Sequence, residues 1–352
     1  MSNLEQKQMP VTYLRIALRD FLFNEDDHRA MLAGTGLTLA QLQQSDAHVS
    51  LATMRDLLLN LSLHLDQPGW HLRLAAHLSI TSHGPLGVAA ATAPDLRTAL
   101  DVLLRYIEIR APFVWLTGET GPDYHRIKIV ESVDLGPVRE LLLETMSLAI
   151  QSIVAAILGR KLTGARLELA CHAPVYRDAL RQAFDGEIEF GCEGHFLSLP
   201  AAWLDESCAL YDDQLHRAAT SRCRDLLRQV TGESDIEVAV RRELLSARAG
   251  MPRLSEVARS QHVSPRTLIR RLKRAGTSFQ TILDDVHRAL AVDLLLHSEL
   301  QIAEIAYRLG FRDPANFNRA FRAWTGQAPG RFRSLARKGS DDQVKPAQKV
   351  TR

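Results

Sequence analysis

Two stretches of the chain repeat a pattern of two short helices joined by a turn, and this duplication limits the possible folds more than any other feature. The first is LSEVARSQHVSPRTLIRRLK and the second is IAEIAYRLGFRDPANFNRAFRAW. They align at an offset of 48 before the turn and 49 after it, because one residue is inserted where a turn can absorb it. The matched positions are Leu254 with Ile302, Val257 with Ile305, Ala258 with Ala306, Pro265 with Pro314, Leu268 with Phe317 and Leu272 with Phe321. We therefore expect two helix-turn-helix units, over residues 254–274 and 302–324.

Each unit contains residues suited to end one helix and begin the next. Gly310 can adopt the left-handed conformation that terminates a helix, and His262 must adopt it at the equivalent position. Ser264 and Asp313 can cap the second helix of each unit, and a proline follows at the first helical position, where no amide hydrogen is needed. A helix expected over 279–297 joins the units. At ~1.5 Å per residue it spans roughly 28 Å, comparable with the ~34 Å between successive major-groove windows on one face of DNA.

The helical spacing separates an inward from an outward face on the second helix of each unit. Phe317, Phe321 and Trp324 lie at i, i+4 and i+7, and Leu268 and Leu272 have the same spacing in the first unit. An α-helix fits the DNA major groove, where Arg binds guanine and Asn binds adenine through paired hydrogen bonds, while other cations contact phosphates. The residues left outward are the candidate DNA contacts Arg266, Ile269, Arg270, Lys273, Arg274, Arg312, Ala315, Asn316, Arg319 and Arg322.

A solvated charged face would explain either helix alone, but the charge distribution favours a polyanionic partner. Residues 251–340 contain sixteen Lys or Arg and seven Asp or Glu, a net charge of +9. The remaining 262 residues contain 27 basic and 34 acidic side chains, a net charge of −7. A basic segment in an otherwise acidic chain indicates that its charge serves a local purpose. Because Ile269 and Ala315 cannot hydrogen-bond a base, we expect them at most to contact thymine methyl groups.

The first 230 residues have mixed periodicity, which predicts an α+β domain. Helical spacing predicts helices from Ser50 to Leu65, from Pro94 to Ile109 and from Pro137 to Gly159. FVWLTGE and HRIKIVE, separated by TGPDY, predict a β-hairpin, and ARLELAC, EIEFG and HFLSLP predict further strands. We expect this domain over 1–230, an all-α domain with two helix-turn-helix units over 231–335, and a disordered tail over 336–352.

The C-terminal third resembles the AraC/XylS family of bacterial transcription regulators. The resemblance covers about residues 236–335 and depends on LSEVA…VSPRTLIRRLK, ALAVDLLLHSELQIAEIAYRLGF and DPANFNRAFRAWTGQAPGRFR. It implies base-reading positions at Arg266, Ile269 and Arg270 on one helix and at Ala315, Asn316 and Arg319 on the other. His262 stands where the family often has glycine, and His287 where it often has arginine.

The first 230 residues resemble the N-terminal domain of one AraC subgroup, on GPLGVAAATAPDLRTALDVLLRYIEI, the hairpin, and YRDALRQAF…IEFG. They do not resemble the cupin-type arabinose pocket, because long helices precede the hairpin. The resemblance implies a domain that senses a small organic effector and supports self-association. It therefore predicts a cytoplasmic regulator, most simply an activator, with double-stranded DNA, the effector, a second copy of the chain and RNA polymerase as partners.

Two alternatives remain open: a regulator whose N-terminal domain only assembles, and an enzyme fused to a DNA-binding domain. The chain has no GxxxxGK[ST], GxSxG or GxGxxG motif, and its four cysteines lack metal-ligand spacing. We therefore expect no catalytic residue, no metal and no cofactor. The longest apolar helix candidate, Met146 to Leu158, is interrupted by Gln151 and Ser152 and is too short to span a bilayer.

Overall fold

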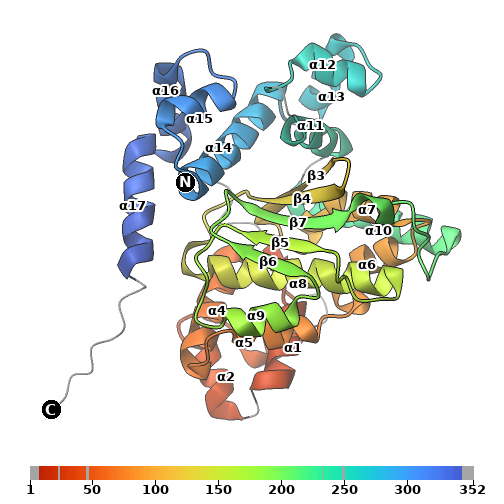
Figure 1. The fold of residues 1–352 in the computed structure, drawn as a ribbon, viewed down its shortest axis with the longest axis vertical. Coiled ribbons are helices and arrows are strands. Elements are labelled where there is room, and N and C mark those ends of the chain that lie inside the picture. Colours follow the sequence, from red (N-terminus) through yellow and green to blue (C-terminus); the bar gives the residue numbers. More distant parts are fainter. Residues whose placement is uncertain (1–7, 23, 45–46, 233, 248–249, 343–352) are drawn as a thin grey trace. The chain divides into compact units, whose positions relative to one another are not determined.

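The computed structural model describes residues 8–342 except 23, 45–46, 233 and 248–249 (Figure 1). The chain forms two compact units, residues 1–238 and 239–352. The boundary follows Val238, inside helix α11 (Asp235–Leu245), whereas the sequence analysis places it near Thr231. The first unit combines helices with a mixed sheet and the second is helical, which confirms the expected fold class.

A five-stranded mixed sheet with the order β3-β4-β7-β5-β6 lies in the first unit (Figure 1). Only the β5–β6 pairing is parallel. The predicted hairpin is confirmed as β3 and β4, which pair from Val114 with Glu131 to Thr120 with His125. The strands are β1 (Gln8–Pro10), β2 (His48–Ser50), β3 (Val114–Thr120), β4 (Tyr124–Glu131), β5 (Arg166–Leu169), β6 (Glu187–Phe190) and β7 (His195–Pro200).

The helices of the first unit form one hydrophobic core with the sheet, and their apolar faces are buried as the spacing predicts. Strands β1 and β2, which no sequence pattern predicts, pair through Met9 and Val49 and tie the N-terminal segment to this core. The helices are α1 (Thr12–Phe21), α2 (Glu25–Leu32), α3 (Leu39–Gln43), α4 (Leu51–Leu65), α5 (Trp70–Ala76), η1 (Ile80–His83), α6 (Pro85–Ala91), α7 (Leu96–Tyr106), η2 (Ile107–Ile109), η3 (Gly136–Val138), α8 (Arg139–Leu158), α9 (Arg177–Ala183), η4 (Ala201–Trp203) and α10 (Asp213–Thr231).

The apolar helix that includes α8 is longer than the segment Met146 to Leu158 that the sequence analysis considers as a membrane span. Together with η3 it forms an apolar segment of 23 residues, Gly136–Leu158, which is long enough to cross a bilayer. However, 67% of its most apolar stretch of 18 residues is buried inside the protein, and the helix packs against α5, α6 and α7. Gln151 is satisfied within the fold, because its amide donates to the Ala183 carbonyl at 3.0 Å and accepts from the Asp185 amide at 2.7 Å. The segment is therefore a core helix of the first unit.

The second unit contains the expected duplicated helices. After α11 the helices are α12 (Leu254–Ser260), α13 (Pro265–Arg274), α14 (Phe279–His297), α15 (Ile302–Arg308), α16 (Pro314–Thr325) and α17 (Pro329–Asp342). Helix α17 continues into the segment for which disorder is expected, as far as Asp342, and residues 343–352 lie outside the described residues. The first turn of α17 is held because Phe332 packs edge-on against Phe321 and Arg333 donates to the Leu295 carbonyl.

The two turns repeat the same backbone hydrogen bonds. The Val263 amide donates to the Ala258 carbonyl at 2.9 Å, and the Phe311 amide donates to the Ala306 carbonyl at 2.9 Å. His262 and Gly310 both have positive φ, 53° and 83°, as predicted. The duplication is therefore structural: one backbone geometry is built twice from different side chains.

Helix α14 is buried on more than one side because it supports both helix-turn-helix units. Leu283, Val286, Leu290 and Leu294 lie at helical spacing along it, but of these four only Val286 is fully buried. Farther along, Ala291 and Leu295 belong to the core around α15 and α16. His287 is buried, donates from Nε2 to the Leu309 carbonyl at 3.0 Å, and stacks on Trp324 at 6.0 Å. His287 thus connects α14 to the turn of the second helix-turn-helix unit.

The equivalent turn residues allow a matched test of backbone strain. Replacement of His262 by Gly removes a left-handed non-glycine residue and should raise the local unfolding free energy by about 0.5–1 kcal/mol, net of the greater freedom of glycine in the unfolded chain. Gly310→Ala introduces the same strain and should lower it by about 1–2 kcal/mol. Hydrogen exchange of α12–α13 and α15–α16 peptides measures both effects. Equal changes of the same sign would contradict the equivalence of the turns.

Burial lowers the pKa of His287 from its ordinary value of 6.5, against smaller opposing effects of the Leu309 carbonyl and Asp284. Below pH 6.5 the unfolded chain therefore takes up a proton that the folded unit resists, so stability falls as the pH falls. We expect acidification from about pH 7 to 5 to weaken hydrogen-exchange protection of α14–α16 more in the wild type than in His287→Gln. An equal loss in both proteins at each pH would contradict this role.

Candidate nucleic-acid interface

Helix α13 presents a basic face because its two leucines are fixed in the core. Leu268 and Leu272 are fully buried, and Ser264 caps the helix by accepting a hydrogen bond from the Thr267 amide at 3.2 Å. Pro265 occupies the first helical position, as predicted. The five candidate contacts on α13 are all exposed, namely Arg266, Ile269, Arg270, Lys273 and Arg274. Ile269 is an apolar residue within this basic face and is 52% exposed.

Helix α16 repeats this arrangement with aromatic side chains. Phe317 and Phe321 are fully buried, and Trp324 is partly buried against His287 and Phe311. Asp313 caps the helix by accepting a hydrogen bond from the Ala315 amide at 3.0 Å. The candidate contacts Arg312, Ala315, Asn316, Arg319 and Arg322 are all exposed. Arg312 is the extra residue in the turn of the second helix-turn-helix unit. The turn of the first helix-turn-helix unit has no equivalent cation.

The cations on these two faces are largely uncommitted within the protein. Among the described residues, no ion pair or hydrogen bond engages the side chain of any candidate contact except Arg319 and Asn316, which bond to each other through Nη2 and Oδ1. That contact orients a guanidinium beside an amide on the exposed side of α16. Exposed cations without carboxylate partners can bind phosphates without first breaking an ion pair.

Arg271 is a further candidate contact on α13 that is not among those predicted from helical position. Its side chain is exposed and, within the described part of the chain, has no ion pair. Its exposure and its lack of an ion pair among the described residues place it with the candidate contacts, whereas its position on the helix alone does not. Arg271 lies on the flank of α13, where a phosphate is the more accessible target than a base edge.

One cluster in the first unit has the ligand types of a metal site. Glu140, Glu144 and Cys171 each offer a ligand atom, and these atoms lie within 4.8 Å of one another. The carboxylates already have protein partners, since His71 Nε2 lies 2.7 Å from Glu144 and Arg139 Nη1 lies 2.5 Å from Glu140. Burial, followed by the charge of Glu140, raises the pKa of the Cys171 thiol, which disfavours the thiolate that a metal would bind. The geometry therefore favours a hydrogen-bonded core cluster.

Two family models match the chain in the order of its two units. The model described as the arabinose-binding domain of AraC transcription regulators, N-terminal, matches residues 27–208. The model described as a helix-turn-helix domain matches residues 257–334, which include α13, α14, α15 and α16.

Individual proteins are similar to this chain over different shares of its length. The ornithine utilization regulator of Pseudomonas aeruginosa is 29% identical over 332 residues, covering 94% of this chain and 98% of that protein. The urease operon transcriptional activator of Escherichia coli is 34% identical over 88 residues, covering 25% of this chain and 30% of that protein. The crystal structure of the transcriptional regulator CdpR from Pseudomonas aeruginosa aligns with a TM-score of 0.41 and 23% identity, covering 88% of this chain and 97% of that one. Since the N-terminal model alone matches more than half of the residues, the chain belongs to the AraC family of transcription regulators.

Proposed function

We propose that this regulator binds a specific duplex site by placing α13 and α16, its recognition helices, in neighbouring major grooves. The observation that carries the proposal is the duplicated turn, which gives two exposed, uncommitted basic faces supported by one continuous helix, α14. A 19-residue helix spans roughly 28 Å at ~1.5 Å per residue, close to the spacing of successive major grooves.

Different residues of each recognition helix serve affinity and sequence reading. Arg266 and Arg270 on α13, and Asn316 and Arg319 on α16, have the side chains that form paired hydrogen bonds with guanine or adenine. Lys273, Arg274, Arg312 and Arg322 bind phosphates and set the register on the duplex. Ile269 and Ala315 contribute apolar contacts to thymine methyl groups.

The regulator acts in the cytoplasm, and a small organic effector bound to the first unit controls its affinity for DNA or its self-association. The name of the 29% identical relative, a utilization regulator, supports control by a metabolite, and that of the 34% identical relative supports transcriptional activation. RNA polymerase is then the partner through which the regulator would act. A homodimer would double the number of grooves contacted and lengthen the site. A first unit that only assembles is the alternative, and it predicts that no small molecule stabilises the protein. An enzymatic first unit has no support in the motifs or relatives.

Arg319 and Arg322 separate base reading from phosphate binding on one helix. We expect Arg319→Ala to weaken binding to a duplex selected from a random-sequence library by about 1–3 kcal/mol and to relax the preference at one base pair. Arg322→Ala should weaken all sequences similarly and reduce the slope of log affinity against log salt by about one. Fluorescence anisotropy at several salt concentrations measures both.

Arg29→Ala, which removes a 75% exposed cation of the first unit, is the matched control and should change neither quantity. Unchanged affinity in Arg319→Ala would exclude the proposed placement of α16. Footprinting that protected only one major groove would contradict the use of both recognition helices.

A further inference from the structure

A mostly apolar cavity of about 60 Å³ lies inside the first unit. Residues of β1, α1, η1, α6, α7, η2 and α8 line it, together with the segment that follows η2. The apolar lining includes Leu103, Phe113, Met146 and Ile150. Four side chains in this lining are polar, namely Tyr13, His83, Arg110 and Thr145. The cavity thus has an apolar body and one small set of polar groups, which is the usual composition of a small-molecule site.

Three of the polar groups form a chain of hydrogen bonds with a defined direction. Arg110 donates from Nη2 to the Ser82 carbonyl at 2.8 Å and from Nε to the Tyr13 hydroxyl at 3.4 Å. The Tyr13 hydroxyl lies 2.8 Å from Nδ1 of His83. A guanidinium can only donate, so Tyr13 accepts from Arg110, and its own proton goes to Nδ1 in the tautomer that leaves this nitrogen unprotonated. The proton of a neutral His83 ring is then on Nε2.

His83 is neutral in this setting. Burial, with a smaller contribution from the Arg110 charge, lowers the pKa of His83 from 6.5 to about 4. At neutral pH the ring therefore has one N–H, which lies on Nε2 in the tautomer whose Nδ1 accepts from Tyr13. Among the described residues this Nε2 has no hydrogen-bond partner, although the side chain is only 3% exposed. A buried donor without an acceptor is costly, and an acceptor from outside the protein would relieve that cost.

Two further groups lack a complement in the same cavity. The Thr145 hydroxyl is buried and has no hydrogen-bond partner within the described part of the chain. Arg110 is 9% exposed, and no described carboxylate forms an ion pair with it. Its two hydrogen bonds leave other N–H groups of the guanidinium available. A buried cation, a buried N–H and a buried hydroxyl all favour an anionic acceptor.

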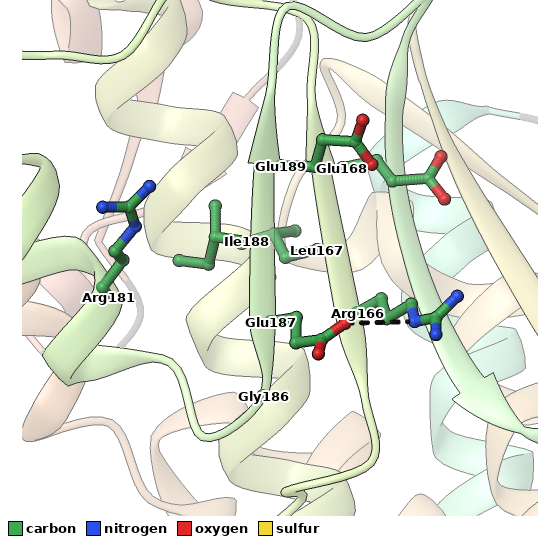
Figure 2. A pocket seen from close by; sticks show the side chains of 8 residues that line it. All are labelled: Arg166, Leu167, Glu168, Arg181, Gly186, Glu187, Ile188 and Glu189. Carbon is green, nitrogen blue, oxygen red and sulfur yellow. Dashed lines mark ion pairs between the residues drawn. The ribbon is translucent and has the colours of Figure 1, made fainter.

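The larger hollow in this unit has different chemistry. Figure 2 shows it over β5 and β6, where Arg166 lies 3.4 Å from Glu187 and the carboxylates of Glu168 and Glu189 lie on the same side. Five of its eight lining residues are charged and four of these are exposed, including Arg181 of helix α9. Water already solvates such groups, so a ligand gains little there. The apolar cavity, with buried groups that lack partners, is the stronger candidate site.

We propose that the cavity between η1, η2 and α8 binds a small monocarboxylate, with its carboxylate against Arg110, His83 and Thr145 and its hydrocarbon part against the apolar lining. The assignment of this ligand as the effector rests on the proposed function, whereas binding itself does not. A volume of about 60 Å³ equals roughly two waters at ~30 Å³ each, so a short acid is favoured. The unbranched side chains of Met9 and Met146 can move to admit a few more carbons. A pentose is disfavoured, because its five oxygens would outnumber the four polar side chains of the lining.

The first experiment uses the full-length protein and isothermal titration. The probes are straight-chain monocarboxylates from acetate to hexanoate, the primary amide and alcohol of each, and arabinose. We expect at least one acid to bind, and its amide and alcohol to bind at least about tenfold more weakly, because they lack the anion that Arg110 complements. Binding of arabinose but of no acid, equal binding of acid and amide, or no binding at all would overturn the proposal.

Variants then place the acid in this cavity. Arg110→Gln should weaken acid binding at least about tenfold and remove the preference for acid over amide. Thr145→Val should weaken it by about threefold to tenfold and leave the fold intact, because the hydroxyl has no hydrogen-bond partner among the described residues. Thr220→Val on α10 is the matched control, since that hydroxyl is also buried without a partner but does not line the cavity. If Arg110→Gln fails to fold, Thr145→Val against Thr220→Val still decides; wild-type acid affinity in Thr145→Val would overturn the proposal.

A DNA-binding measurement separates this proposal from the proposed function. The acid that binds should change the affinity of the wild type for its selected duplex, and the change should be absent in Thr145→Val at the same acid concentration. An acid that binds through Thr145 but leaves DNA affinity unaltered would support the site and exclude effector control by it. A full DNA response to the acid in both Thr145→Val and Arg110→Gln would support effector control and exclude this cavity.

Discussion

The burial of two large side chains on each recognition helix is the constraint on which the interface depends. Leu268 and Leu272 on α13, and Phe317 and Phe321 on α16, are fully enclosed, so neither helix can rotate without exposing them. This packing holds the opposite face in solvent, where its cations find no carboxylate partner among the described residues. The second helix packs with aromatic rings and adds the contact from His287. The same exposed geometry thus arises from two different cores.

Much of this arrangement could be predicted because it is local in sequence. Helical spacing identified the buried side chains, and the positions of His262 and Gly310 identified a turn that needs positive φ. The caps Ser264 and Asp313 depend on residues two or three positions away. The domain boundary and the end of α17 were less predictable. The segment after Thr231, where the boundary is expected, continues into helix α11. Apolar periodicity near the C-terminus is weak, but α17 still extends to Asp342.

The features of the first unit that sequence reasoning missed are those that bring distant segments together. Strand β1 pairs with β2 across about forty residues, and neither strand has a hydrophobic pattern of its own. Tyr13, His83 and Arg110 come from three separate segments and meet only in the folded protein. In the sequence, no one of them has a pattern that distinguishes it from an ordinary partly buried polar residue. Trp70, Trp115 and Tyr106 are buried core residues that do not line the cavity, whereas Phe113 is buried and lines it. Periodicity reports which face of an element is buried, but not which elements share that core.

The two units use cationic side chains under opposite conditions of solvation. On the recognition helices the cations are exposed, so each contributes modestly, salt-dependently and with little selectivity until a base edge is in reach. Arg110 is enclosed with apolar side chains and two neutral hydrogen-bond acceptors, so an anion beside it would gain far more than at the surface. A surface of many weak contacts suits a long polyanion, and one desolvated cation suits a small ligand that must be distinguished from water. Only the enclosed arrangement has a cost in folding free energy, because the exposed cations stay solvated, and apolar burial elsewhere offsets that cost.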